Sequence, residues 1–92
     1  MGRREERLFR INDEIAALRR DEYRAREELI MLGHLDDDAQ RDAAVSGQIV
    51  DAADARETAA DVARMGRHVR DIQAALERLE QKRDRLMAEL GS

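Results

Sequence analysis

The 92-residue chain carries 17 basic and 21 acidic residues, a formal net charge of −4, and has no cysteine, proline or tryptophan, one phenylalanine and one tyrosine. Two aromatics are too few for the cores of β-sandwiches and barrels, and a shortage of Pro and Gly leaves little turn chemistry for a multistranded sheet. The lack of cysteine excludes disulfide frameworks and thiolate metal sites. A composition dominated by Ala, Glu, Arg, Leu and Asp is typical of long amphipathic helices, so we expect an all-α fold.

The N-terminal segment, MGRREERLFR, is charged and lacks the apolar core of a signal peptide. No part of the chain approaches the run of about 18 apolar residues that a membrane helix needs. We therefore expect a cytoplasmic protein that makes no contact with a membrane.

The first predicted helix covers about residues 3–45. Its apolar residues recur at alternating intervals of three and four, which is the heptad pattern of a helix that packs along another helix. We call these positions the seam of the first helix, and they are Leu8, Ile11, Ile15, Leu18, Glu22, Ala25, Leu29, Leu32, Asp36, Ala39 and Ala43.

One segment of this helix favours a break. Gly33 is a poor helix former, and the aspartates at positions 36, 37 and 38 are good residues for a helix N-terminus. A chain that breaks within residues 33–38 would form three helices, and this arrangement is the alternative to an unbroken first helix.

The second predicted helix, about residues 50–90, follows a turn at about 46–49 whose signals are Ser46 and Gly47. Its seam is again unbroken and consists of Ala55, Thr58, Val62, Met65, Val69, Ile72, Leu76, Leu79, Arg83, Leu86 and Leu90. If the chain folds back at Gly47, facing seam residues have position numbers that sum to 94, as in the pair Leu29 and Met65. Because two independent heptad patterns agree on this centre, the sequence predicts a long antiparallel coiled-coil hairpin that forms one domain over residues 1–92.

A second apolar line follows the first seam at an offset of one residue. We call it the outer stripe, and it consists of Phe9, Ala16, Tyr23 and Ile30 with Met31 beside it. A two-helix hairpin buries one seam per helix, so this stripe stays exposed unless the protein associates. We expect Phe9, Tyr23, Ile30 and Met31 to bind a partner, most simply a second copy in a homodimeric four-helix bundle.

Charge is unevenly distributed along the chain. Residues 34–61, here called the acidic segment, contain eight carboxylates and two arginines, a formal charge of −6. Such a segment repels phosphates, so we expect no direct nucleic-acid partner. A basic cleft on another protein or a divalent ion would suit it better, although acids also keep an alanine-rich turn soluble.

The residue types needed for catalysis are scarce. His34 and His68 are far apart in the predicted hairpin, no thiol is present, and neither Ser46 nor Thr58 has a neighbouring base. No phosphate-binding loop or metal-ligand spacing occurs. We expect no enzyme activity and no cofactor, and a non-enzymatic protein–protein interaction module, either an adaptor or a structural homodimer.

Two segments resemble a known family. Residues 47–55, GQIVDAADA, resemble the Gly-Asp-Leu-x-Glu-Asn-Ala-Glu-Tyr tip of the coiled-coil finger of bacterial Gre transcript-cleavage factors. Residues 68–76, HVRDIQAAL, are similar to the Arg-Ile-x-x-Ile-Glu-x-x-Leu run further along that finger.

The resemblance implies a second hypothesis, a transcription regulator that enters the secondary channel of RNA polymerase. In that family two tip acids help to bind a second magnesium ion. Here Gln48 stands in place of one acid, while Asp51 and Asp54 keep acidic positions. The globular domain that anchors the family's finger to polymerase is not found in these 92 residues. We therefore expect stimulation of cleavage to be lost and a binding or competing role through Asp51 and Asp54 to remain.

Overall fold

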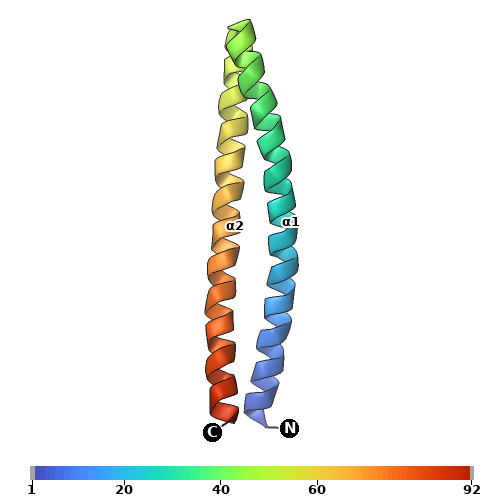
Figure 1. Cartoon of the computed structure of the whole chain (residues 1–92), viewed down its shortest axis with the longest axis vertical. Coiled ribbons are helices and arrows are strands. Elements are labelled where there is room, and N and C mark those ends of the chain that lie inside the picture. Colours follow the sequence, from blue (N-terminus) through green and yellow to red (C-terminus); the bar gives the residue numbers. More distant parts are fainter. Residues whose placement is uncertain (1, 92) are drawn as a thin grey trace. The chain divides into compact units, whose positions relative to one another are not determined.

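The structure is a computed structural model that describes residues 2–91. Two helices, α1 (Arg3–Ser46, 44 residues) and α2 (Ile49–Leu90, 42 residues), make up nearly all of this part of the chain (Figure 1). These bounds lie within one residue of the expected ones, and residues 2–91 contain no strand. The all-α helical hairpin is therefore confirmed, and its assembly into a four-helix bundle stays a prediction.

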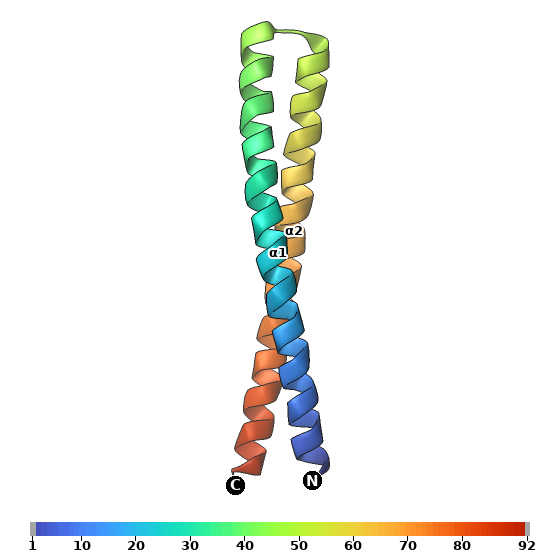
Figure 2. The ribbon, with the colours of Figure 1, turned by 90° about the vertical axis from the view of Figure 1, so that its right-hand side faces the viewer.

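The chain divides into two compact units. Unit 1 contains the described residues 2–23, which include the start of α1, and residues 70–91 at the end of α2. Unit 2 is the continuous segment Arg24–Val69. In unit 1 the first and last segments of the chain run antiparallel, and in unit 2 the two helices flank the turn (Figure 2).

The seam forms the core of both units. The hydrophobic residues that are buried within residues 2–91 all occupy predicted seam positions: Ile15, Ile72, Leu76 and Leu86 in unit 1, and Ala25, Ala55 and Val69 in unit 2. Every other seam residue of α1 is half-buried, and in α2 only the terminal Leu90, 37% exposed, falls outside the core. The heptad pattern thus predicted the core.

A side-chain hydrogen bond confirms the predicted register in unit 2, and an ion pair links the two helices in unit 1. In unit 2, the hydroxyl of Thr58 donates a hydrogen bond of 2.8 Å to the carboxylate of Asp36, and these two positions sum to 94. In unit 1, Arg19 forms an ion pair of 3.3 Å with Glu80. These contacts join residues 22 and 61 positions apart, so they report the alignment of α1 with α2 inside each unit.

The predicted alternative of a break within residues 33–38 is wrong. Helix α1 continues without interruption from Arg3 to Ser46. The physical reason is that Asp36 does not cap a helix end. Its carboxylate instead accepts hydrogen bonds from Gln40, one turn later in α1, and from Thr58 of α2.

The turn depends on Gly47, whose φ of +65° lies in the left-handed region that favours glycine. The amide of Gly47 donates to the carbonyl of Ala43 at 3.1 Å and so closes the last turn of α1. The Ser46 hydroxyl accepts the amide hydrogen of Gln48 at 3.2 Å and donates to the carboxylate of Asp51 in the first turn of α2. Ser46 therefore ties the end of α1 to the start of α2.

The seam can be tested with one substitution made at two isoleucines. Ile15 is 3% exposed in the seam, whereas Ile30 is 56% exposed in the outer stripe. We expect Ile15→Ala to lower the free energy of unfolding by about 2–5 kcal/mol, because it removes buried methyl groups and leaves a cavity. Urea unfolding followed by circular dichroism measures the change.

Ile30→Ala is the matched control and should change the free energy of unfolding by about 0.5 kcal/mol or less. Equal losses in the two variants would contradict the assignment of Ile15 to the core.

Candidate partner-binding surfaces

The outer stripe is exposed, as the sequence predicts. In unit 1, Phe9 and Tyr23 are 52% and 67% exposed, and Ala16 is exposed between them. In unit 2, Ile30 and Met31 are 56% and 62% exposed. These two residues line a shallow groove on α1 together with Glu27, Glu28 and His34.

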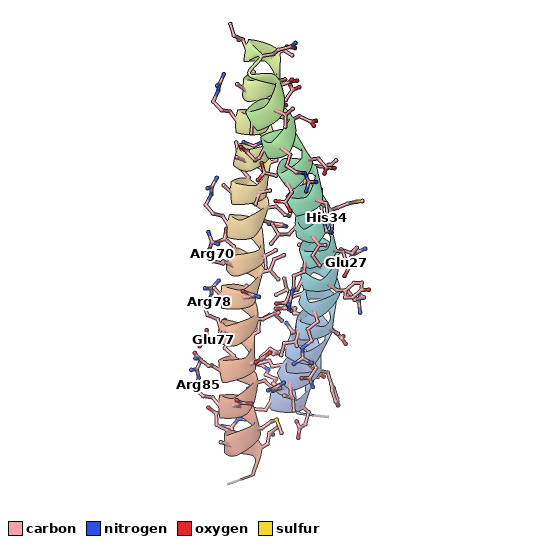
Figure 3. All side chains as sticks on the ribbon, turned by 45° about the horizontal axis from the view of Figure 1, so that its top comes forward. Glu27, His34, Arg70, Glu77, Arg78 and Arg85 are labelled. Carbon is pink, nitrogen blue, oxygen red and sulfur yellow. The ribbon has the colours of Figure 1, made fainter. Side chains whose placement is uncertain are left out.

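The equivalent face of α2 is charged. The positions of α2 that match the outer stripe follow every second seam residue, Val69, Leu76 and Arg83, and are Arg70, Glu77 and Asp84, all exposed. Figure 3 shows Arg70 and Glu77, with Arg78 and Arg85, on the side of α2 that faces away from α1. An outward helix face of this fold thus does not require apolar residues, and the aromatic positions of α1 need another explanation.

The acidic positions at the turn differ in their surroundings. Asp51 is half-buried and accepts the hydrogen bond from Ser46, and its place in the first turn of α2 suits the positive end of the helix dipole. Asp54 is exposed. The structure therefore gives Asp51 a local role in the turn and leaves Asp54 open to a partner.

Three exposed apolar residues beside the turn were missed by the sequence analysis. Val45, Ile49 and Val50 are 89%, 86% and 64% exposed. Turns usually carry polar residues, so valine and isoleucine on both sides of Ser46 and Gly47 were the available signal. They extend the list of candidate contact residues in unit 2.

A polar layer interrupts the apolar seam in unit 2. The side-chain amide of Gln40 donates to the carboxylate of Asp36 and to the backbone carbonyl of Ala55, both at 2.9 Å. The Thr58 hydroxyl donates to the same oxygen of Asp36, and within residues 2–91 no buried side-chain polar atom lacks a partner. The layer thus satisfies the one carboxylate in the α1 seam of this unit.

The same contacts explain the acidity of Asp36. The hydrogen bond from Gln40, and then the one from Thr58, stabilise the ionised carboxylate and lower the pKa of Asp36 below its ordinary value. Partial burial acts in the opposite direction but is the smaller effect.

An open groove between the helices of unit 2 brings together charged residues of both helices. The groove in unit 2 is lined by His68 with Glu28, Asp61, Arg64, Leu32 and Met65, a set without a hydroxyl or thiol nucleophile. Within the described residues, no three His, Asp or Glu side chains are grouped so that they could hold a metal ion. Over the same residues, neither helix contains a stretch long and apolar enough to traverse a lipid bilayer.

No protein-family model matches this chain, and neither a curated protein nor a solved structure does.

The polar layer predicts a pH dependence of stability. Because the pKa of Asp36 in the folded protein lies below the unfolded value of about 3.9, its ionised form stabilises the fold above that pH. This stabilisation is lost as the pH falls through the folded pKa. We expect Asp36→Asn to be less stable than wild type near neutral pH, and the difference to shrink in acid, as measured by urea unfolding across the acid range.

Asp37→Asn is the matched control, because the neighbouring Asp37 is exposed and makes no cross-helix hydrogen bond within residues 2–91. A constant difference between wild type and Asp36→Asn at every pH would show that ionisation of Asp36 does not stabilise the hairpin.

Proposed function

We propose that this protein is a non-enzymatic interaction module that binds a partner through the outer stripe of α1, and that the partner is a second copy of the chain. The observation that carries the proposal is the contrast between the two helices. Phe9 and Tyr23 are exposed on α1 in unit 1, whereas the equivalent positions of α2 carry Arg70, Glu77 and Asp84. An apolar line on only one of two solvated faces is the pattern of a helix that associates.

The energetics favour association. Full burial of a large apolar side chain is worth about 1.5–3 kcal/mol, and both aromatics of the chain are more than half exposed. A homodimer would bury two copies of each residue. The hairpin alone has a thin core of seven buried hydrophobic residues in the described chain, so an interface would add substantially to its stability.

Sedimentation equilibrium tests the homodimer. We expect the wild type to sediment at twice the 10.5 kDa chain mass at about 100 μM, a concentration well above the Kd of a stable helical interface. Phe9→Glu combined with Tyr23→Glu should produce a monomer that keeps its helical circular dichroism, because both side chains lie outside the core.

Ile49→Glu is the matched control, since it also places a carboxylate at an exposed apolar position, 86% exposed, but outside the stripe. It should remain a dimer. A wild type that sediments as a monomer would overturn the homodimer, and loss of the dimer in Ile49→Glu would move the interface to the turn.

A second candidate function is the transcription regulator that binds RNA polymerase through the turn, without stimulating cleavage. It is favoured by the exposure of Asp54 within the acidic segment, whose formal charge is −6. An acidic surface of this kind is suited to a basic cleft, and such binding weakens as salt screens the charges.

Purified bacterial RNA polymerase tests this candidate directly. We expect Asp54→Asn to weaken binding without loss of helicity, because Asp54 is exposed. Asp51→Asn is less specific, since it also disturbs the hydrogen bond with Ser46. Asp71→Asn, an exposed acid of unit 1, controls for net charge. No binding of wild type to polymerase, or equal weakening by Asp71→Asn and Asp54→Asn, would overturn a role of the turn.

A further inference from the structure

We infer that the homodimer is antiparallel, with the unit 1 segment of α1 from Phe9 to Tyr23 packed against the same segment of the second copy and with Ala16 on the two-fold axis. This inference rests on the proposed function, because it specifies how the two copies meet. It concerns a segment whose aromatic ends are exposed and whose centre is a small exposed residue.

The spacing of the segment makes it self-complementary. When one helix face packs antiparallel against its own copy, the position numbers of any two facing residues add up to the same value. The two-fold axis then repeats each contact between the two copies. A sum of 32 places Phe9 against Tyr23 of the partner subunit, and Ala16 against Ala16 of the partner subunit. Both aromatics of each chain are then covered. The alanines at the axis allow the two helices to approach closely.

The flanking charges favour the same alignment. Asp13 and Arg20 lie on one side of the stripe, both are exposed, and neither takes part in an ion pair within residues 2–91. Flanking residues on the same side face each other in an antiparallel pair, so Asp13 lies opposite Arg20 of the partner subunit. The two-fold axis repeats this contact. At the rim, an attraction between Glu5 and Arg26 of the partner subunit offsets a repulsion between Glu6 and Glu27 of the partner subunit.

Other alignments of the stripe bring like charges together or place an aromatic side chain against a carboxylate. An antiparallel alignment in which facing position numbers sum to 39 covers Ile30 as well. It places Arg20 against Arg20 of the partner subunit and Asp13 against Glu27 of the partner subunit. An antiparallel sum of 46 places Phe9 against the partner's Asp37. A parallel dimer in register brings Arg19 beside the partner's Arg20. The sum of 32 has one like-charge contact, Glu6 with Glu27 of the partner subunit, but it alone pairs Phe9 with Tyr23 of the partner subunit and places Asp13 opposite Arg20 of the partner subunit.

The charge of the two units also favours contact through unit 1. The sequence of unit 1 contains eleven basic and eleven acidic residues, whereas unit 2 contains six basic and ten acidic residues. Two copies of a neutral surface meet without net repulsion, and two acidic surfaces do not. The segment from Phe9 to Tyr23 belongs wholly to the neutral unit.

Charge reversal with rescue tests the alignment. We expect Asp13→Arg and Arg20→Asp, each made alone, to raise the Kd of the dimer about tenfold at low salt, because each turns two attractive contacts into two repulsive ones. The double variant Asp13→Arg/Arg20→Asp should return to within about threefold of wild type. Leu35→Glu should leave the Kd unchanged, because Leu35 is 56% exposed on α1 but lies outside the outer stripe. Sedimentation and far-ultraviolet circular dichroism are recorded for each variant.

Disulfide trapping gives an independent test in a chain that has no cysteine. Ala16→Cys should form a covalent dimer under mild oxidation, because residues on the two-fold axis come within the short Cα separation of a disulfide. Ala44→Cys is the matched control, since Ala44 is an exposed alanine four heptads later on the same helix. It should stay reduced in the antiparallel dimer.

The outcomes separate the inference from the function on which it rests. A wild-type dimer in which the double charge reversal fails to rescue, or in which Ala44→Cys is trapped as readily as Ala16→Cys, would overturn the antiparallel alignment and leave the homodimer standing. A monomeric wild type would overturn both.

Discussion

The burial of one heptad seam per helix is the constraint on which the rest of this structure depends. The chain has two aromatics, neither of them in the core, and its buried hydrophobic residues within positions 2–91 are Ile, Leu, Val and Ala at seam positions. A helix of about 40 residues has little stability of its own in water unless one face is packed. Because each seam lies against the other, the charged majority of residues can remain in solvent. The same constraint leaves large apolar residues outside the seams, such as Phe9, Tyr23 and Ile30, exposed.

The polar layer of Asp36, Gln40 and Thr58 adds specificity to this packing. Heptad seams made of small aliphatic residues are similar from one heptad to the next, so a slip by seven residues changes little in purely apolar contacts. A carboxylate that accepts a hydrogen bond from Thr58 of the other helix does distinguish between alignments. Gln40 strengthens the effect because its amide also reaches the carbonyl of Ala55 across the seam. Gly47, with its left-handed backbone, and this polar layer each contribute to the alignment of α1 with α2 near the turn.

The candidate contact surfaces follow from what the seam leaves uncovered. In unit 1, the outer-stripe positions of α1 include the aromatics Phe9 and Tyr23, whereas the matching positions of α2 are Arg70, Glu77 and Asp84. In unit 2, the exposed apolar residues lie beside the turn and are accompanied by many carboxylates. These surfaces are chemically different, so the two candidate functions depend on different residues and can be separated by substitution.

The sequence by itself determined the helix bounds, the core and the alignment of the two helices, because a heptad pattern encodes all three locally and the turn glycine sets their common centre. Tertiary structure decided the questions that depend on distant partners. Local propensity at residues 33–38 favours a break. The carboxylate of Asp36 instead accepts a hydrogen bond from Thr58, 22 residues away, and α1 is continuous. Asp51 was predicted as a contact residue, yet its proximity to Ser46 gives it a role within the turn. The exposure of Val45 and Ile49 likewise depends on how the chain reverses at Gly47, because residue type alone favours burial for both.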